Sequence, residues 1–146
     1  MDLILWRHAD AESGSPDSAR KLTERGHVQA NRVADWLKPR LPLGCEVLVS
    51  PAARAQQTAL ALGMRFVTTP AVGIDASAAD VIAAAGWPGH PHAILIVGHQ
   101  PTLGRVAAML LSGAQADWEI GKGALWWFVR TNGKVALRSA VDTELL

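Results

Sequence analysis

Two arginines and two histidines are the residues of this chain whose chemistry would combine best at one site: Arg7, His8, Arg54 and His99. A guanidinium group binds two oxygens of a phosphate at once through its planar fork of N–H donors. A neutral imidazole can attack phosphorus, and a second imidazole can donate a hydrogen bond to the charge that develops. If the four side chains meet, they can bind a dianionic phosphoryl group and accept it on a histidine.

Three short apolar runs precede these residues and predict buried strands: residues 3–6, 46–50 and 93–97. Each run ends in a polar or proline-marked turn. A helix expected over residues 51–62, with proline at its start, places Arg54 one turn in. Because the carboxyl ends of parallel strands meet at one edge of a sheet, we expect the two arginines and two histidines to converge there.

Apolar residues at helical spacing predict a helix that begins after Thr23, a plausible N-cap, and ends near Lys38, before a proline. Gly26 in its first turn lowers helix propensity, which indicates close packing. Two more helices are expected over residues 77–85 and 102–111.

A further strand is expected over residues 65–67. Near the C-terminus, runs at 125–130 and 134–138 flank Asn132-Gly133, a turn typical of a β-hairpin. The chain therefore predicts an α/β fold with three layers, α/β/α, and a mainly parallel sheet with a C-terminal antiparallel hairpin. We expect residues 1–146 to form a single domain.

The composition limits the possible partners of the chain. Hydrophobic residues make up 49% and charged residues 18% of the sequence, which is typical of a globular protein. The net charge of +1 gives no basic excess for nucleic acid, and no apolar run is long enough to span a membrane. The single cysteine, Cys45, and the lack of a signal peptide predict a cytoplasmic protein.

Four segments resemble motifs of the histidine phosphatase superfamily, which contains the phosphoglycerate-mutase-like enzymes. Residues 7–9 resemble its Arg-His-Gly signature, with Ala9 in the place of glycine. Residues 22–30 are similar to its Leu-Thr-x-x-Gly-x-x-Gln-Ala segment. Residues 50–59 are similar to Ser-Pro-x-x-Arg-Ala-x-Gln-Thr-Ala, and residues 97–101 to the motif of the second histidine. The four motifs occur in the family's order.

The resemblance implies that His8 is the nucleophile and becomes transiently phosphorylated, while Arg7, Arg54 and His99 bind the phosphate. It implies no metal and no other cofactor. The remaining histidines are expected on an exposed helix surface or in loops: His27, His90 and His92.

The compact length of the chain, the opening Arg-His-Ala-Asp-Ala of residues 7–11 and the run from Asp17 to Thr23 look like those of SixA-type phosphohistidine phosphatases. The segment between Phe66 and Val97 is too short for the cap domain of larger members. An open site accepts a phosphate displayed on a macromolecule more easily than it encloses a metabolite. The resemblance thus implies removal of phosphate from phosphohistidine on a signalling or phosphotransfer protein, with inorganic phosphate as product.

Two alternatives stay open. The first is a broad or metabolite-directed phosphomonoesterase acting on a small phosphoester, which needs an acid to protonate the leaving oxygen. The candidate acids are Asp75, after the third expected strand, and Asp10, beside the nucleophile. A weak or missing acid would favour phosphohistidine, because imidazole is the better leaving group. The second alternative is a catalytically silent module that binds phosphorylated partners.

Overall fold

A six-stranded sheet with strand order β3-β2-β4-β1-β5-β6 runs through the centre of the computed structural model, which describes residues 1–146. Four neighbouring strands, β3, β2, β4 and β1, are parallel, whereas β5 is antiparallel to β1 and β6 to β5. The strands are β1 (Asp2–Arg7), β2 (Glu46–Val49), β3 (Val67–Thr68), β4 (Ile94–Gly98), β5 (Leu125–Thr131) and β6 (Lys134–Val141).

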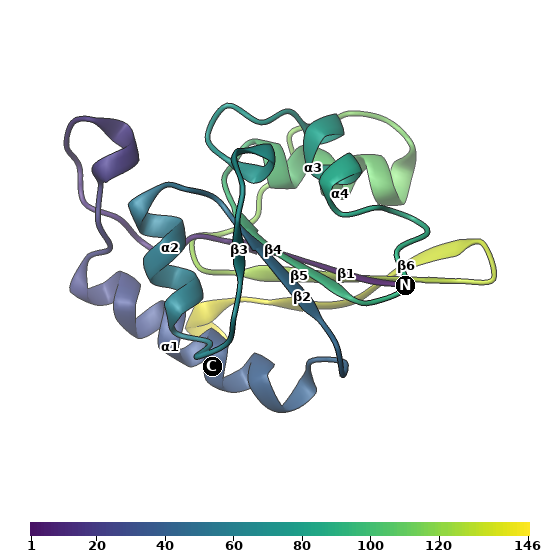
Figure 1. Ribbon diagram of the computed structural model, residues 1–146, viewed down its shortest axis with the longest axis horizontal. Helices are drawn as coiled ribbons and strands as arrows, with labels where there is room; N and C mark the ends of the chain where they lie inside the picture. Colours follow the sequence, from purple (N-terminus) through teal and green to yellow (C-terminus); the bar gives the residue numbers. More distant parts are fainter.

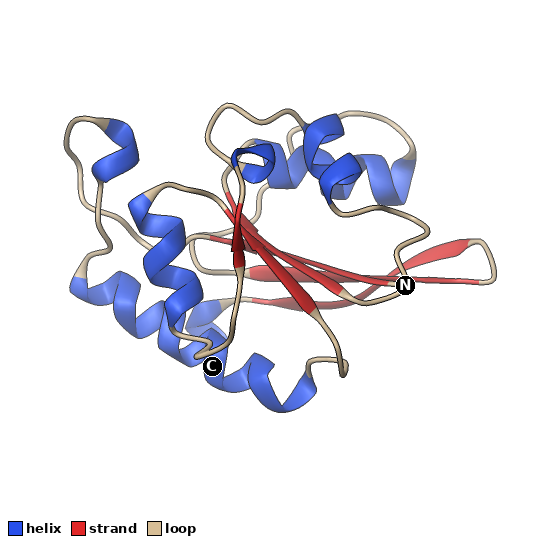
Figure 2. Cartoon of the chain, viewed as in Figure 1, coloured by secondary structure: helices blue, strands red, loops and turns tan.

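Helices cover both faces of the sheet, so the three-layer α/β/α prediction is confirmed (Figures 1 and 2). The helices α1 and α2 lie on one face, and α3 and α4 lie on the other. Their bounds are α1 (Glu24–Leu37), α2 (Ala53–Leu60), α3 (Ala78–Ala84) and α4 (Thr102–Ser112). No helix combines the length and the hydropathy needed to cross a bilayer.

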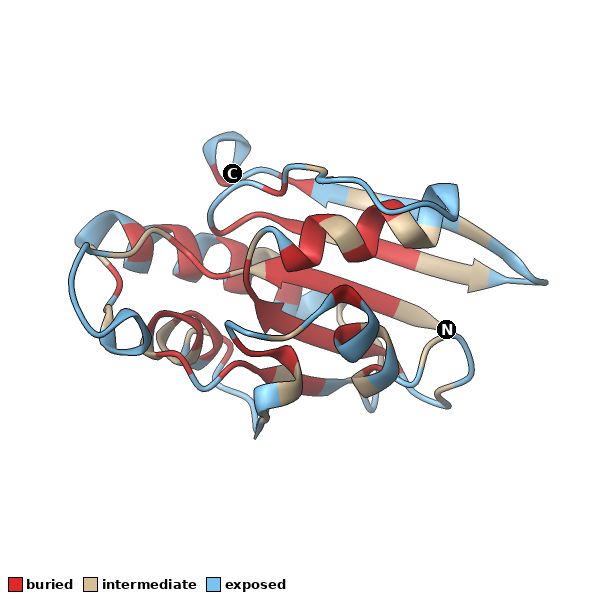
Figure 3. Cartoon of the chain, turned by 90° about the horizontal axis from the view of Figure 1, so that it is seen from above, coloured by how far each residue is buried: buried red, intermediate tan, exposed pale blue.

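Strand β1 divides the core into two layers because its side chains alternate between the faces of the sheet. Ile4 and Trp6 pack with α1 and α2, whereas Leu3 and Leu5 pack with α3 and α4. All four side chains are completely buried. Burial runs along the central strands and ends at the exposed tip of the β5–β6 hairpin (Figure 3). The strand that ends in Arg7 is therefore fixed from both sides.

The predicted helix start at Thr23 is confirmed, because its hydroxyl oxygen accepts a hydrogen bond from the Gly26 backbone N–H at 3.0 Å. Gly26 is needed for close approach: a Cβ there would collide with the carbonyl oxygen of Asp10. This contact presses the start of α1 against the loop that follows β1. At the hairpin turn, Asn132 and Gly133 both have positive φ, as the predicted turn requires.

Two predicted boundaries were wrong. Helix α2 begins at Ala53 rather than Pro51, because Ala52 is extended and acts as the N-cap. The expected strand over residues 65–67 overlaps β3 only at Val67. Strand β3 consists of the two residues that pair with Leu48 and Val49 at the carboxyl end of β2. It therefore begins at Val67, after the apolar Phe66 on which the prediction depended.

Candidate active site

The carboxyl ends of β1 and β4 bring the two candidate histidines together. Arg7 is paired with Gly98 in the sheet, and the His8 backbone N–H donates to the Gly98 carbonyl oxygen at 3.0 Å. The rings of His8 and His99 lie 5.3 Å apart between centroids, with an angle of 54° between their planes. The residues that follow neighbouring parallel strands thus lie side by side, as the sequence predicts.

The hydrogen bonds of His8 define which ring nitrogen carries a lone pair. Its Nδ1 lies 2.7 Å from the carbonyl oxygen of Ala9, and its Nε2 lies 3.2 Å from Nε of Arg54. A guanidinium nitrogen only donates, so Nε2 must accept and the ring proton resides on Nδ1. The lone pair of Nε2 therefore points at the group that would also bind a phosphate.

His8 is also kept uncharged. Only 8% of the residue is exposed, and burial lowers the pKa of His8 to about 3. The Ala9 carbonyl opposes this shift, and the charges of Arg54 and Arg7 act in the same direction as burial. At neutral pH the imidazole is unprotonated at Nε2, the state that a nucleophile requires.

Ser50 gives His99 the same tautomer as His8, but His99 offers its N–H to the site rather than its lone pair. The hydroxyl oxygen of Ser50 accepts from the Ala52 backbone N–H at 3.2 Å and lies 2.7 Å from Nε2 of His99. The buried hydroxyl has no other acceptor for its hydrogen, so we assign that hydrogen to Nε2, which leaves the ring proton on Nδ1. Burial, then the charge of Arg54, lowers the pKa of His99 to about 4, so the ring is neutral. His99 thus presents an N–H donor.

Two buried side-chain atoms of the protein lack any hydrogen-bond partner, and both belong to this site: Nε of Arg7 and Nδ1 of His99. An unsatisfied buried donor costs about 1–3 kcal/mol. An anion that accepts from both atoms would remove this cost. The unpaired donors therefore indicate a binding position for a phosphate beside His8.

Neighbouring loops hold both arginines. Nη1 of Arg7 donates to the Ile120 carbonyl oxygen at 2.9 Å. Arg54 is only 5% exposed, and its Nη1 donates to the backbone oxygen of Asp17 at 2.8 Å. Because these contacts use the outer nitrogens, Nε of Arg54 stays hydrogen-bonded to His8 and Nε of Arg7 stays unpaired.

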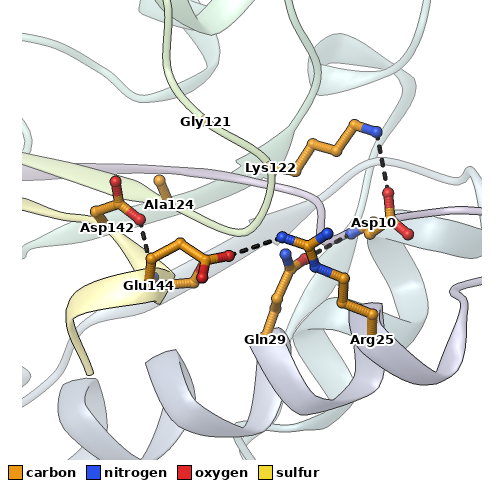
Figure 4. Close-up of a pocket in the computed structure, with 9 residues that line it drawn as sticks. Asp10, Arg25, Gln29, Gly121, Lys122, Ala124, Asp142 and Glu144 are labelled. Atoms are coloured by element: carbon orange, nitrogen blue, oxygen red, sulfur yellow. Dashed lines mark hydrogen bonds and ion pairs between the residues drawn. The ribbon is translucent and has the colours of Figure 1, made fainter.

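Asp10 lies beside this site but does not contact its four side chains. One carboxylate oxygen accepts from the Thr23 hydroxyl at 2.7 Å, and the other pairs with Lys122 at 2.9 Å (Figure 4). These two hydrogen bonds lower the pKa of Asp10, so the carboxyl group is ionised. It lines a hollow of about 310 Å³ together with Gln29 and Lys122. This arrangement disfavours Asp10 as a proton donor.

Asp75 is exposed and lines an open hollow of about 210 Å³ together with Ser50 and Pro51. It forms no ion pair or hydrogen bond with His8 or His99. Its position next to Ser50 keeps it near the site, but it forms no hydrogen bond with the site histidines.

The remaining histidines lie outside the site: His27 on α1, and His90 and His92 in the loop before β4. The chain has no group of three or more His, Cys, Asp or Glu side chains arranged to hold a metal ion.

Three functional contacts could not be inferred from the sequence. Ser50 is part of a recognised motif, but its hydrogen bond to His99 depends on the pairing of β2 with β4. Asp17 and Glu119 both form ion pairs with site arginines, although they lie in loops far from them in sequence. The sequence pointed to one of these residues only: the run from Asp17 to Thr23 resembles SixA-type enzymes, but the resemblance assigned Asp17 no role.

Comparison with known proteins shows the family of the chain. Residues 3–73 match the model of the histidine phosphatase superfamily (branch 1). Over 138 residues the chain is 32% identical to an uncharacterized protein of Mycobacterium tuberculosis, a match that covers 92% of this chain and 87% of that protein. The chain therefore belongs to the histidine phosphatase superfamily.

Within that superfamily the chain is SixA-like. It is 41% identical over 59 residues to the phosphohistidine phosphatase SixA of Escherichia coli, a match that covers 40% of this chain and 37% of SixA. Its fold matches the structure of the protein histidine phosphatase SixA complexed with tungstate, with a TM-score of 0.79, 23% identity and 99% of each chain covered.

The fold is also similar to that of a phosphoserine phosphatase mutant from Entamoeba histolytica in complex with phosphoserine, with a TM-score of 0.75 and 18% identity. That match covers 99% of this chain and 98% of the other. These relatives support phosphatase activity and differ in the substrates for which they are named.

Proposed function

We propose that this protein is a phosphohistidine phosphatase that forms a covalent phosphohistidine intermediate on His8. The observation that carries the proposal is the lone pair of His8 Nε2, which faces Nε of Arg54, with both residues buried. Two further donors, Nε of Arg7 and Nδ1 of His99, lack partners beside it. A module that only binds phosphate would need the donors but not the lone pair.

In the proposed first step, Arg7, Arg54 and His99 bind the phosphoryl oxygens and orient phosphorus toward His8. The lone pair of Nε2 forms a bond to phosphorus while the bond to the leaving group breaks. Positioning and charge stabilisation are the main contributions that a protein makes to phosphoryl transfer. The Ala9 carbonyl oxygen accepts a hydrogen bond from Nδ1–H throughout, which stabilises the positive charge of the phosphorylated ring.

In the second step, the oxygen of a water molecule forms a bond to phosphorus while the P–N bond to His8 breaks and its electron pair returns to Nε2. Inorganic phosphate leaves with both protons of the water, and His8 is neutral again. The same three donors stabilise the transition state of this step, because the phosphoryl group stays in place while its partner changes. In both steps, His8 thus exchanges the bond to phosphorus, and Arg7, Arg54 and His99 bind the phosphoryl oxygens.

The leaving group favours phosphohistidine over a phosphate ester. Asp10 is ionised by Thr23 and Lys122, and Asp75 is solvent-exposed without a contact to His8. An alkoxide leaving group needs an acid that donates a proton, whereas a protonated imidazole ring leaves as a neutral molecule. The segment between β3 and β4 holds only a short 3-10 turn and α3, so a phosphorylated protein can approach the site.

A phosphomonoesterase is the second candidate, because Asp75 lines the hollow beside Ser50. Parallel assays of a phosphohistidine-bearing peptide and para-nitrophenyl phosphate distinguish the two, with His8→Ala as control. We expect strong preference for the peptide, with turnover lost in the variant. Preference for the ester, lost on Asp75→Asn, would establish the second candidate instead.

A further inference from the structure

Each arginine of the site is paired with a carboxylate from a different loop. Nη2 of Arg54 lies 3.1 Å from Oδ2 of Asp17, in the segment between β1 and α1. Nη1 of Arg7 lies 3.4 Å from Oε1 of Glu119, in the segment between α4 and β5. We call Asp17 and Glu119 the rim carboxylates. The proposed reaction does not require either of them.

The rim carboxylates and a phosphate can be present together. Asp17 occupies the two outer nitrogens of Arg54, whose Nε faces His8 instead. Glu119 approaches Nη1 of Arg7, whose Nε has no partner. A phosphate can therefore bind the Nε side of both guanidinium groups without displacing a carboxylate.

The two carboxylates lie at the surface, whereas the groups they hold are buried. The side chains of Asp17 and Glu119 are 51% and 82% exposed, compared with 6% for Arg54 and 17% for Arg7. The leaving group of a bound substrate extends from the buried phosphate toward solvent, the side on which both rim carboxylates lie. The charge of the leaving group then affects binding.

We propose that Asp17 and Glu119 are specificity-determining residues, which favour a phosphorylated imidazole that carries a positive charge and disfavour phosphate esters that carry none. The proposal rests on the proposed function, because it concerns the substrate of the same site. A phosphohistidine ring protonated on its second nitrogen is a cation, and a carboxylate can accept that N–H.

The chemistry of such a substrate needs no separate acid. The lone pair of His8 Nε2 forms the new bond to phosphorus, and the electron pair of the broken P–N bond returns to the substrate ring. The ring keeps the proton on its second nitrogen and leaves as neutral imidazole. The rim carboxylates contribute by favouring the protonated ring before the bond breaks.

Asp17 is ionised at the pH values at which the substrate ring is protonated and can donate to it. Hydrogen bonds from Arg20, then from Arg54, lower the pKa of Asp17. The charged and titratable groups that face the rim are Arg20 and Arg54 at Asp17, and Arg7 at Glu119, with His8 and His99 neutral beneath them.

Two peptides of one sequence test the proposal, one phosphorylated on histidine and the other with phosphoserine at the same position. The variants are Asp17→Asn, Glu119→Gln and the double variant. Asp117→Asn and Glu144→Gln are matched controls, because each also removes an exposed carboxylate paired with an arginine. The measured quantity is the ratio of kcat/KM for phosphohistidine to kcat/KM for phosphoserine.

We expect this ratio to fall about threefold for each rim variant and about tenfold for the double variant, the scale of exposed charge pairs. The alkaline limb of the phosphohistidine pH profile should also move to lower pH, because loss of the carboxylates lowers the pKa of the bound substrate ring. The control variants should change neither quantity.

An equal fall in kcat/KM for both peptides, with an unmoved alkaline limb, would overturn the proposal and leave the carboxylates as supports for the arginines. Glu119→Gln protects this conclusion against misfolding, because Glu119 is highly exposed. Failure of the proposed function has a different signature: the wild-type protein would then hydrolyse only the phosphoserine peptide.

Discussion

Nε of Arg54 lies 3.2 Å from Nε2 of His8, and this contact links the phosphate-binding group directly to the nucleophile. The donor orients the imidazole so that its lone pair lies where phosphorus would bind. When phosphorus takes its place in front of Nε2, the same N–H is free to donate to a phosphoryl oxygen. One residue of α2 thus prepares the nucleophile and afterwards stabilises the group that it receives.

Replacement of Arg54 with lysine keeps the charge but removes this geometry. A lysine ammonium cannot donate in one plane to His8, to the backbone oxygen of Asp17 and to its carboxylate oxygen Oδ2. We expect kcat to fall about 100-fold in Arg54→Lys, the cost typical of losing a positioned donor. Steady-state kinetics would check this, with Arg105→Lys as a control at an exposed ion pair. Unchanged kcat in Arg54→Lys would contradict the role assigned to the contact.

Ser50 should control the tautomer of His99. Without its hydroxyl group, Nε2 of His99 loses the donor that leaves the proton on Nδ1. We expect Ser50→Ala to lower kcat/KM about tenfold, consistent with the loss of one buried hydrogen bond. Ser139→Ala on β6 is the matched control. Nitrogen-15 NMR of His99 would report the tautomer directly, and an unchanged tautomer in Ser50→Ala would refute this role.

Much of this site follows from the sequence, because its residues are adjacent to strand ends. Arg7, His8 and His99 directly follow apolar runs, and the parallel pairing of β1 with β4 brings them together. Such positions depend on local patterning and on one topological rule. Of the two wrong boundaries, the one over residues 65–67 lies where pairing with β2 sets the strand, and the one at Pro51 lies before the extended Ala52, whose N–H bonds the Ser50 hydroxyl oxygen.

The ion pairs at the site could not be predicted in the same way. Glu119 lies 112 residues from Arg7, in a loop whose path depends on how α4 and β5 are connected. Nothing in its local sequence distinguishes it from other exposed acids. Asp17 likewise reaches Arg54 only because its loop folds back over α2. Contacts between loops depend on tertiary structure, which a pattern of residue types does not encode.

Acid should destabilise the fold through the two buried histidines. The folded pKa values of about 3 for His8 and about 4 for His99 lie below the usual value of 6.5. The unfolded chain therefore binds more protons in this range, and the free energy of unfolding rises with pH. The contribution is complete above pH 6.5 and is lost as the pH falls toward the folded values.

Each unit of lowered pKa corresponds to about 1.4 kcal/mol of stability at neutral pH. Urea unfolding of the wild type and of His99→Gln between pH 4 and about 7 would measure this effect. We expect a smaller pH dependence in the variant, because one of the two titrating groups is gone. Equal slopes would show that His99 is not held neutral.

Gly26 should be required for the position of the nucleophile loop. A Cβ at residue 26 would collide with the Asp10 carbonyl oxygen, two residues after His8. We expect Gly26→Ala to destabilise the protein by about 1–3 kcal/mol, the usual cost of overpacking. Gly89→Ala serves as the control, because a Cβ there meets nothing within 4 Å. Thermal unfolding of both variants checks the prediction, which fails if the two have the same stability.

Trapping of the covalent intermediate tests the central claim most directly. Wild-type protein mixed with a labile phosphodonor, quenched in alkali and digested, should yield a peptide phosphorylated on His8. Nitrogen-15 and phosphorus-31 NMR should place the phosphoryl group on Nε2, because Nδ1 is held by the Ala9 carbonyl. Phosphate turnover with no label on His8, or with a label on Nδ1, would contradict the account.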